Sequence, residues 1–274
     1  MANNITFIGA GNMARAIIGG LLDSGFSADR ITAAAPSEEE LAPLRESMGV
    51  HTHTDNNEAV KSADVVILAV KPQIMQGVCR ALADTVQTKT PLIVSIAAGL
   101  EAATIDGWLG GNTALVRCMP NTPSLVGVGA SGLYANEQVN DAQRRLAGEL
   151  LEAVGIVEWV EDEALLDAVT AVSGSAPAYF FLMFEAMEEA GVAQGLPAAT
   201  ARRLAIQTAL GAATMAAQSE HDPATLKRNV MSPNGTTERA IAHMESAKLR
   251  ETIQGAMQAC AERASEMARE LRGQ

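Results

Sequence analysis

The chain of 274 residues has little of three things: cysteine, positive charge and long apolar runs. Its cysteines, Cys79, Cys118 and Cys260, are scattered with no C-x-x-C spacing, which fits reduced thiols in a cytoplasm. Lysine and arginine number 20 against 32 aspartates and glutamates, and the net charge of −12 argues against nucleic acid or an anionic membrane as a partner. The longest buried-looking run, 65–70, is far too short to span a bilayer. We therefore expect a cytoplasmic globular protein.

Two further absences narrow the chemistry. The first strand is expected to start almost at Met1, so we expect no signal peptide. His51 and His53 lie on an expected strand, but no cluster of cysteine or aspartate accompanies them, so we expect no metal site. None of the four histidines lies in a motif associated with catalysis.

The N-terminal segment carries a nucleotide-binding pattern. A short apolar strand leads into Gly9 and Gly11, with Ala14 as the third small position, and a helix of apolar period follows. In this Gly-x-Gly-x-x-Ala form of the dinucleotide fingerprint, Gly9 permits the tight turn, Gly11 lets the pyrophosphate approach, and Ala14 packs the helix against the strand. The alternative is merely a tight strand–helix turn. The position after a strand and before a helix favours the nucleotide site.

The first part of the chain alternates β-branched runs with helical stretches, which is typical of βαβ units and of a parallel sheet covered on both faces. We expect an α/β fold, with an N-terminal Rossmann-type doubly wound sheet over residues 1–161. The expected strands are 5–8, 31–34, 65–70, 92–96 and 114–119, with later ones near 132–134 and 156–159, and the expected helices are 12–23, 37–48, 73–86, 101–108 and 139–153.

Beyond residue 161 the strand signal stops, and an all-α C-terminal domain is expected over 162–274, with helices at 163–172, 177–194, 198–218 and 249–271. The last helix must bury an apolar stripe either within its own domain or against a second subunit. We predict a chain that is at least dimeric through this region. The stripe consists of Leu249, Ile253, Met257, Cys260, Ala264, Met267 and Leu271.

The most informative segment is the late turn 232–237, with the sequence SPNGTT, which precedes a helical pattern. It delivers the hydroxyls of Thr236 and Thr237, together with unpaired backbone N–H groups, to the start of a helix. Helix N-termini of this kind hold small carboxylates, and Gly235 lets the backbone approach a ligand closely. The alternative is that Thr236 or Thr237 is an ordinary N-cap.

The segment after the second strand bears on the cofactor. An enzyme that uses NAD usually places an acid there to hold the ribose 2′-hydroxyl, whereas this chain has AAAPS at 33–37. Ser37 offers a hydroxyl beside a helix N-terminus, which suits a 2′-phosphate and equally suits an N-cap with Glu40 at the third helical position. No arginine lies in this loop. Lys71 lies at the end of a later strand, where a side chain can contact the cofactor or the substrate. The alternative is a lysine that is exposed to solvent and has no role in binding.

Taken together, these segments resemble pyrroline-5-carboxylate reductases, the enzymes of the last step of proline biosynthesis. The final segment is similar to the family's own signature and is much more specific than the dinucleotide fingerprint. The resemblance implies hydride transfer from NAD(P)H to the C=N carbon of 1-pyrroline-5-carboxylate, giving L-proline. The missing acid at 33–37 predicts NADPH as the preferred donor, with NADH as a second donor. The matching pieces are FIGAGNMARAI at 7–17, LAVKPQIM at 68–75, SIAAG at 95–99, RCMPNTP at 117–123, VSGSAPAY at 172–179 and NVMSPNGTTERAI at 229–241.

The resemblance also implies subunits that interlock as dimers through the helical domain and assemble further into decamers. The chain departs from some members at Ala35, which leaves the 2′-phosphate contact to Ser37, and at Asn234, for which we expect a left-handed conformation. The implied cofactor contacts are Gly9, Ala10, Gly11, Asn12, Met13, Ser37, Asn56, Ala69, Val70, Lys71, Pro72, Ala97, Ala98 and Asn229, and the implied substrate contacts are Glu163, Ser175, Gly235, Thr236 and Thr237.

Thr237 is the candidate catalytic residue. An iminium ion is already activated, so the protein need not supply a strong acid. The Thr237 hydroxyl can hydrogen-bond the ring nitrogen, but a threonine is a poor proton donor at neutral pH, so we assign it positioning and at most a relay through water. The turn around Ser175 is also open to a purely structural interpretation as a helix kink.

Two rival functions stay in view. The β-hydroxyacid dehydrogenases share this layout but need a catalytic lysine in the helical half, where only Lys227 and Lys248 stand, neither of them in a glycine-led helical motif. A nucleotide-sensing protein without catalysis would have no use for the pocket at 232–237.

Overall fold

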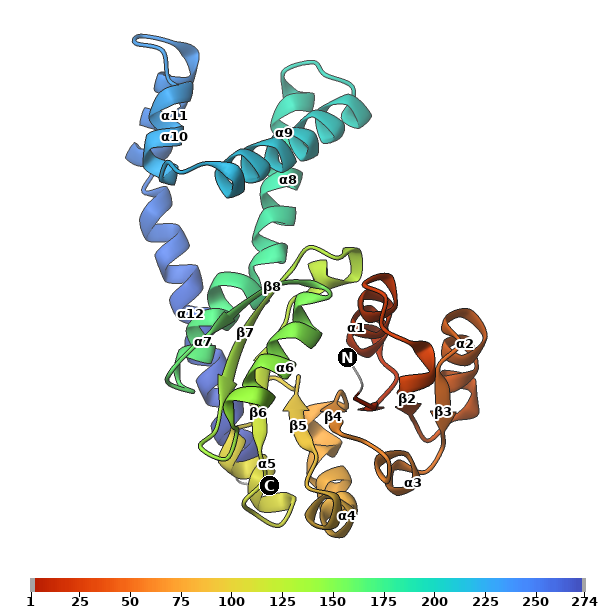
Figure 1. Ribbon diagram of the computed structural model, residues 1–274. Helices are drawn as coiled ribbons and strands as arrows, with labels where there is room; N and C mark the ends of the chain where they lie inside the picture. The colour runs from red at the N-terminus through yellow and green to blue at the C-terminus, as the bar shows by residue number, and fades with distance from the viewer. Residues whose placement is uncertain (1–2, 273–274) are drawn as a thin grey trace. The chain divides into compact units, whose positions relative to one another are not determined.

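The computed structural model describes residues 3–272, with side chains described through residue 270 (Figure 1). The chain forms two compact units. The first combines Met1–Ser175 with Ala259–Gln274, and the second is Ala176–Gln258. The expected fold class is confirmed: an N-terminal Rossmann-type sheet is followed by a helical region.

The first unit is built on one eight-stranded sheet in the order β3-β2-β1-β4-β5-β6-β7-β8. Neighbouring strands are parallel except β6 and β7, which are antiparallel. These two strands are joined by a short segment with only a single-turn 3-10 helix, too short for the crossover that a parallel pair requires. The strands are β1 (Ile5–Ile8), β2 (Ile31–Ala34), β3 (His51–His53), β4 (Val65–Leu68), β5 (Leu92–Ser95), β6 (Leu115–Met119), β7 (Gly129–Ala135) and β8 (Gly155–Trp159).

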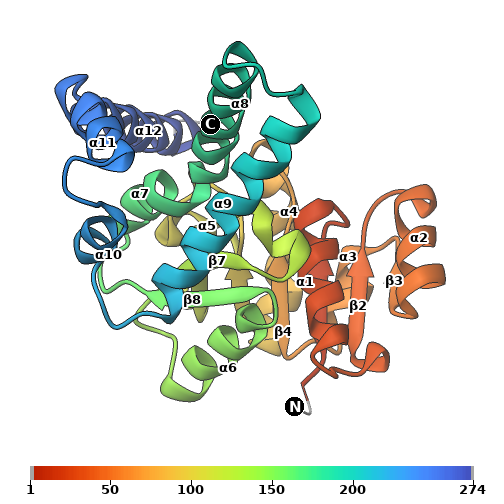
Figure 2. The same ribbon diagram turned by 90° about the horizontal axis from the view of Figure 1, so that it is seen from above.

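Helices cover both faces of this sheet, as Figures 1 and 2 show. Alternate strand residues face opposite sides, so Phe7 and Ile67 belong to one core cluster while Ile8 and Leu68 belong to the other. The first cluster is completed by α1 (Asn12–Asp23), α2 (Glu38–Met48) and α6 (Asp141–Glu152), and the second by α3 (Asn56–Val60), α4 (Pro72–Lys89) and α5 (Ala102–Trp108). Burial on both faces explains why the central strands are continuous apolar runs in the sequence.

The rest of the chain is helical. The first unit also contains α7 (Leu165–Val169), continued by a π-helical turn Thr170–Gly174, and the C-terminal part of α12 (Leu249–Arg272). That part of α12 packs in its own unit, since Ser265 donates to Asp167 at 2.5 Å and the Cys260 thiol lies 3.2 Å from the Ser175 hydroxyl. The side chain of Leu271, the last residue of the predicted stripe, lies outside the described residues. The helices of the second unit are α8 (Ala176–Ala193), α9 (Ala198–Gln218), α10 (Pro223–Val230) and α11 (Thr236–Ser246), together with the start of α12.

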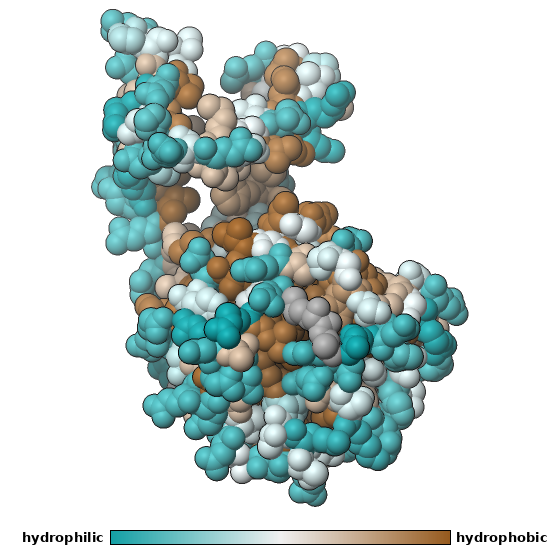
Figure 3. Space-filling view, in the orientation of Figure 1, coloured by the Kyte–Doolittle hydropathy of each residue, from teal (hydrophilic) through white to brown (hydrophobic). Residues whose placement is uncertain are grey.

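The second unit has almost no buried core in the single chain. Its buried hydrophobic residues are Ala176, Ala201 and Ala205, all of them small. Large apolar side chains on α8 and α9 are exposed instead, as the hydropathy-coloured surface illustrates (Figure 3). Those most exposed are Phe180, Phe181, Leu182, Leu204, Leu210 and Met215.

Candidate functional site

The loop between β1 and α1 has the shape of a dinucleotide cradle. Gly9 has φ +108°, and a Cβ there would lie 2.6 Å from the carbonyl oxygen of Ala69, so no other residue fits without rearrangement. A Cβ on Gly11 would meet nothing within 4 Å, so the space in front of it is open. Ala14 is buried, while Asn12 and Met13 begin the helix with backbone N–H groups that have no intrahelical partner. These residues fit a pyrophosphate.

The predicted contacts at 69–72 follow directly after β4, beside this loop. Ala69 donates its N–H to Ile8 at 2.8 Å, which continues the strand pairing up to the glycine turn. Lys71 then occupies the N-cap of α4 with an exposed side chain, and Pro72 is the first helical residue. Because the carboxyl ends of parallel strands meet at one edge of the sheet, the structure brings 69–72 and the glycine loop together.

Ser37 lies at the N-cap of α2, as predicted, but its hydroxyl makes no capping hydrogen bond. The Glu40 N–H instead donates to the backbone carbonyl of Ser37 at 3.2 Å. The capping box that the sequence allowed is therefore wrong, because the first turn closes through the main chain. The half-buried Ser37 hydroxyl stays available for another acceptor or donor.

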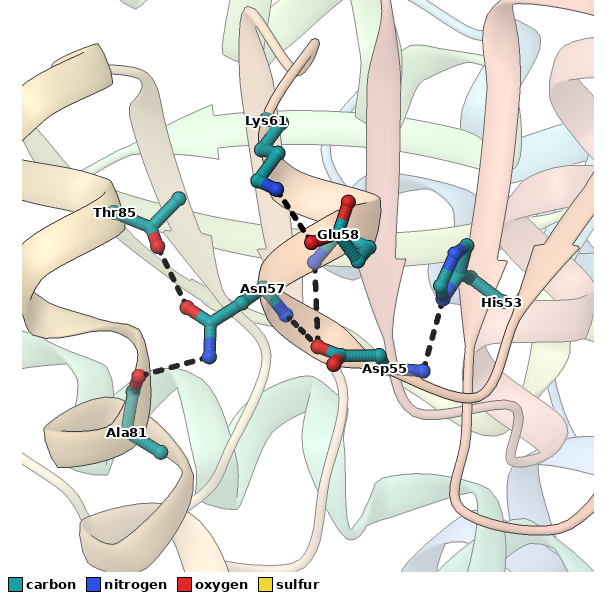
Figure 4. A network of polar contacts seen from close by, with 7 residues as sticks. All are labelled: His53, Asp55, Asn57, Glu58, Lys61, Ala81 and Thr85. Atoms are coloured by element: carbon teal, nitrogen blue, oxygen red, sulfur yellow. Dashed lines mark hydrogen bonds and ion pairs between the residues drawn. The ribbon is translucent and has the colours of Figure 1, made fainter.

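A polar network surrounds the start of α3, the helix whose first residue is Asn56 (Figure 4). Asp55 caps this short helix by accepting from the N–H groups of Asn57 and Glu58, at 2.8 and 3.3 Å. The His53 Nδ1 accepts from the Asp55 N–H at 2.9 Å, which ties the helix start to the end of β3. Asn57 anchors the segment to α4 by donating to the Ala81 carbonyl and accepting from Thr85. These bonds fix the backbone at the start of α3, where Asn56 lies, close to the carboxyl end of β3.

A cavity of about 230 Å³ in the first unit joins predicted cofactor and substrate contacts. Ala97 and Ala98, which follow β5, line it together with Ser175. The turn before Ser175 is positioned by the buried Asn121, which donates to the Ser173 carbonyl at 3.1 Å and accepts from the Ala130 N–H at 2.9 Å. The lining also includes Arg117 from β6, Asp167 from α7, and Cys260 and Arg263 from α12. The sequence does not place Cys260 and Arg263 at this cavity, because α12 reaches it only through the tertiary fold.

Glu163 is already engaged by two groups of its own unit. Its Oε1 accepts from the Ala102 N–H at 2.6 Å and from the Arg117 guanidinium at 2.8 Å, and both charged side chains are largely buried. The pair ties the start of α5 to β6. Burial, and to a lesser extent the Glu163 charge, raises the pKa of Tyr134.

The predicted substrate turn lies in the second unit, at the start of α11. Asn234 has φ 59°, which confirms the expected left-handed conformation, and its N–H donates to Glu238 Oε2 at 2.6 Å. The N-cap is Gly235, so the alternative that Thr236 or Thr237 caps the helix is wrong; they are its first two residues. A Cβ on Gly235 would lie 2.9 Å from the Ser232 carbonyl oxygen. Asn229, near the end of α10, belongs to the same unit.

Neither threonine hydroxyl makes a hydrogen bond to the part of the chain that the structure describes, and Thr237 is half-buried while Thr236 is exposed. The N–H groups of 236–238 lie in the first turn of an eleven-residue helix and have no intrahelical acceptor. Within residues 3–272 no group of three His, Cys, Asp or Glu side chains could hold a metal ion.

Two family models match the chain. One, described as NADP oxidoreductase coenzyme F420-dependent, covers residues 4–99, and the other, described as pyrroline-5-carboxylate reductase dimerisation, covers 163–267. The fold and the first model define an NAD(P)H-dependent oxidoreductase of Rossmann type. The chain is also 52% identical over 267 residues to a pyrroline-5-carboxylate reductase of Pseudomonas aeruginosa, with 97% of each chain covered. The chain belongs to the pyrroline-5-carboxylate reductase family.

Solved structures agree with this assignment. A pyrroline-5-carboxylate reductase from Coxiella burnetii is 45% identical with a TM-score of 0.95, covering 98% of this chain and 99% of its own. The Plasmodium falciparum enzyme, solved with NADP bound, is 27% identical with a TM-score of 0.85, covering 97% and 98%. The reaction is hydride transfer from NAD(P)H to 1-pyrroline-5-carboxylate, giving L-proline, and the chain self-associates.

The dimerisation model also bears on an apolar stretch of the chain. Residues 165–193 are long and apolar enough to cross a membrane by length and composition alone, and only 17% of their most apolar window is buried in the single chain. The dimerisation model covers this stretch entirely. In this family a second copy of the chain can cover the exposed apolar stretch 165–193.

Proposed function

We propose that the chain reduces 1-pyrroline-5-carboxylate with NADPH as the preferred donor, that residues 1–161 form the cofactor domain, and that 162–274 form the domain for dimerisation and substrate. The observation that carries the substrate part is the turn before α11. There Asn234 is left-handed, and the N-cap residue Gly235 has no side chain to cap the helix, so the first N–H groups of the helix stay exposed. These donors suit the carboxylate of the substrate.

All but one of the proposed cofactor residues lie in the first unit, along one edge of the sheet. The open space at Gly11 and the free N–H groups of α1 suit the pyrophosphate, and the small Ala97 and Ala98 leave room for the nicotinamide ring. When bound, the nicotinamide supplies the hydride. The set is Gly9, Ala10, Gly11, Asn12, Met13, Ser37, Asn56, Ala69, Val70, Lys71, Pro72, Ala97 and Ala98 from the first unit and Asn229 from the second.

The preference for NADPH rests on the end of β2. No acid stands at 33–37 to hold a ribose 2′-hydroxyl, and the unbonded Ser37 hydroxyl is free to donate to a 2′-phosphate. Ser37→Glu should shift preference toward NADH, because the new carboxylate repels the phosphate. Measuring kcat/KM for both donors tests this, and a clear advantage of NADH in the wild-type enzyme would contradict it.

Thr237 is proposed to position the imine nitrogen, with Thr236, Gly235, Glu163 and Ser175 as further substrate contacts. Its hydroxyl has no partner in the described chain, so binding a ring nitrogen breaks no existing bond. The N–H groups of 236–238 hold the carboxylate and thereby fix the ring relative to the hydroxyl. Glu163 must contact the substrate through an oxygen not already shared with Arg117 and Ala102, and its Oε2 is that oxygen.

Replacing Thr237 tests the substrate site. Thr237→Val keeps the shape of the side chain but removes the hydrogen bond, which should cost about 1.5–3 kcal/mol, or roughly ten- to a hundredfold in kcat/KM for the imine. Thr236→Val is the matched control on the neighbouring position and should do less, because that residue contributes its backbone N–H. NADPH affinity should barely change. Normal kcat/KM in Thr237→Val would remove the chemical role.

The assembly is proposed to be a dimer through the helical domain, built further into decamers, in the cytoplasm, with no nucleic acid or membrane as partner. The exposed apolar helices and the dimerisation match support the dimer, and the net charge of −12 supports the absence of anionic polymer partners. Light scattering would test the assembly, and a stable monomer at micromolar concentration would overturn it.

A further inference from the structure

Arg15 occupies a position that the sequence pattern did not reveal. It lies on the first turn of α1, directly after the dinucleotide fingerprint. Its Nε donates to the Ala10 carbonyl at 2.9 Å, and one terminal nitrogen donates to the Glu40 carbonyl at 3.1 Å. The guanidinium is therefore fixed between the phosphate loop and the first turn of α2, the turn that begins after Ser37.

The Arg15 guanidinium forms no ion pair in the part of the chain that the structure describes, although the first turn of α2 carries Glu38, Glu39 and Glu40. Both of its hydrogen-bond partners within residues 3–272 are neutral backbone carbonyls. The acid next to Ser37 is Glu38, and it is paired with Arg45 at 2.5 Å. This pairing raises the pKa of Arg45 and draws the Glu38 carboxylate along α2. Arg15 is thus a cation without an ion-pair partner in the described residues, beside the first turn of α2, which follows the loop after β2.

In dinucleotide folds the end of the second strand faces the adenosine ribose, and enzymes that use NADP accommodate the 2′-phosphate with an arginine there. This chain has no arginine in the loop 33–37, yet the fold brings Arg15 from α1 to the first turn of α2, which follows that loop. Arg15 has five N–H donors, of which two are engaged. The others include the terminal nitrogen that binds neither carbonyl.

We propose that Arg15 is the specificity-determining cation for the 2′-phosphate of NADPH and that it acts with the Ser37 hydroxyl. The two carbonyls orient the guanidinium before the cofactor binds, so little side-chain freedom is lost on binding. This inference rests on the proposed preference for NADPH. The preference for NADPH would then depend chiefly on Arg15, which lies outside the loop 33–37 that usually carries such an arginine.

Direct binding measurements test the assignment. Nicotinamide fluorescence gives the Kd of NADPH and of NADH, and displacement by 2′,5′-ADP or 5′-AMP isolates the phosphate from the nicotinamide end. In Arg15→Gln the Kd of NADPH and of 2′,5′-ADP should rise about ten- to a hundredfold, while those of NADH and 5′-AMP stay within about twofold. Arg15→Lys should recover part of the loss, because the charge remains without the planar fork.

Arg80→Gln, which removes an exposed arginine from α4, is the control for loss of positive charge alone and should leave both affinities unchanged. Equal weakening of NADPH and NADH in Arg15→Gln would show that Arg15 merely supports the loop and would overturn the inference. Retention of the wild-type NADPH preference in Arg15→Gln would also overturn it while leaving the NADPH proposal intact. A wild-type enzyme that binds both cofactors equally would instead refute the NADPH proposal, and this inference with it.

Discussion

The two units of the chain bury their apolar residues in different ways. In the first, whole strands such as β1 and β4 are buried, and two helical layers complete the core within one copy. In the second, the buried hydrophobic residues are three alanines, while phenylalanines and leucines lie on the surface. A helix that is apolar all round is stable only when it is covered. The first unit is therefore complete in one chain, whereas the second requires another copy.

This difference separates two roles along the sequence. The proposed cofactor residues belong almost entirely to the first unit, and the proposed substrate turn at Gly235 belongs to the second. Four perturbations, from the largest expected effect to the smallest, test whether the two units differ in this way.

The largest effect is expected from a charge on the exposed apolar face of α9. Leu210 is 59% exposed in the single chain, and Leu210→Asp would bury an unpaired carboxylate in the dimer, at a cost of several kcal/mol. Light scattering should show loss of the oligomer. Gln218→Asp adds the same charge to an exposed polar position of the same helix and should leave the oligomer intact. An unchanged mass for Leu210→Asp would place the interface elsewhere.

A substitution that creates a cavity in the core of the first unit should lower stability without affecting the oligomer. Leu68 is fully buried in β4, so Leu68→Ala should lower stability by about 2–5 kcal/mol. Because this core lies within one copy, the shift in Tm between wild type and variant should not depend on protein concentration. Thermal unfolding at several concentrations checks this, and a shift that grows on dilution would show that the first unit also depends on its partner.

The ion pair inside the first unit should have a smaller effect. Glu163→Gln removes the charge that Arg117 contacts in a largely buried setting, and we expect a loss of about 1–2 kcal/mol in urea unfolding. Glu161→Gln is the matched control, because its pair with Arg144 leaves Glu161 85% exposed, and its effect should be negligible. Equal losses of stability in the two variants would show that the pair between Glu163 and Arg117 does not stabilise the fold.

The smallest effect is a dependence on pH that arises only in the first unit. Burial raises the pKa of the Cys79 thiol from 9.0 to about 12, and residues 176–258 contain no cysteine. Below pH 9.0 the thiol is protonated in both the folded and the unfolded state, and its contribution to the free energy of unfolding is fully present. Above pH 9.0 the free energy of unfolding falls, because the unfolded thiol loses its proton while the folded one keeps it. The fall should reach at most about 1.4 kcal/mol per pH unit.

Urea unfolding at pH 8.5 to 10 should show a steeper loss of stability for wild type than for Cys79→Ala, in which this thiol is absent. Other groups titrate in this range, so the difference between the two slopes carries the test. Parallel slopes would show that the Cys79 thiol ionises equally in both states.

Much of the first unit could be predicted from the sequence because its signals are local. The strands 5–8 and 31–34 and the helix 12–23 have the predicted bounds, since continuous apolar runs and the glycine turn fix them. Elements of a few residues were missed, such as α3, whose only local signal is the Asp55 cap. The helix α10 at 223–230 was also missed, although its Asp-Pro start is a local signal for a helix N-terminus.

The site was predictable where one segment carries it and was not where the tertiary fold assembles it. The left-handed Asn234 followed from its place in the turn, and Gly9 from the fingerprint. The sequence does not show that Arg15 reaches Glu40, 25 residues away, nor that Arg117 and Ala102 already occupy Glu163. These contacts join segments whose proximity is set by the packing of helices on the sheet.

The NADPH affinity of the Leu210→Asp variant is the most direct measurement of the division between the two units. If the cofactor cradle is complete in one copy, the monomeric variant should bind NADPH with a Kd within about fivefold of wild type and should fail to reduce 1-pyrroline-5-carboxylate. A monomer that loses NADPH binding together with activity, or one that keeps full activity, would contradict this division between the two units.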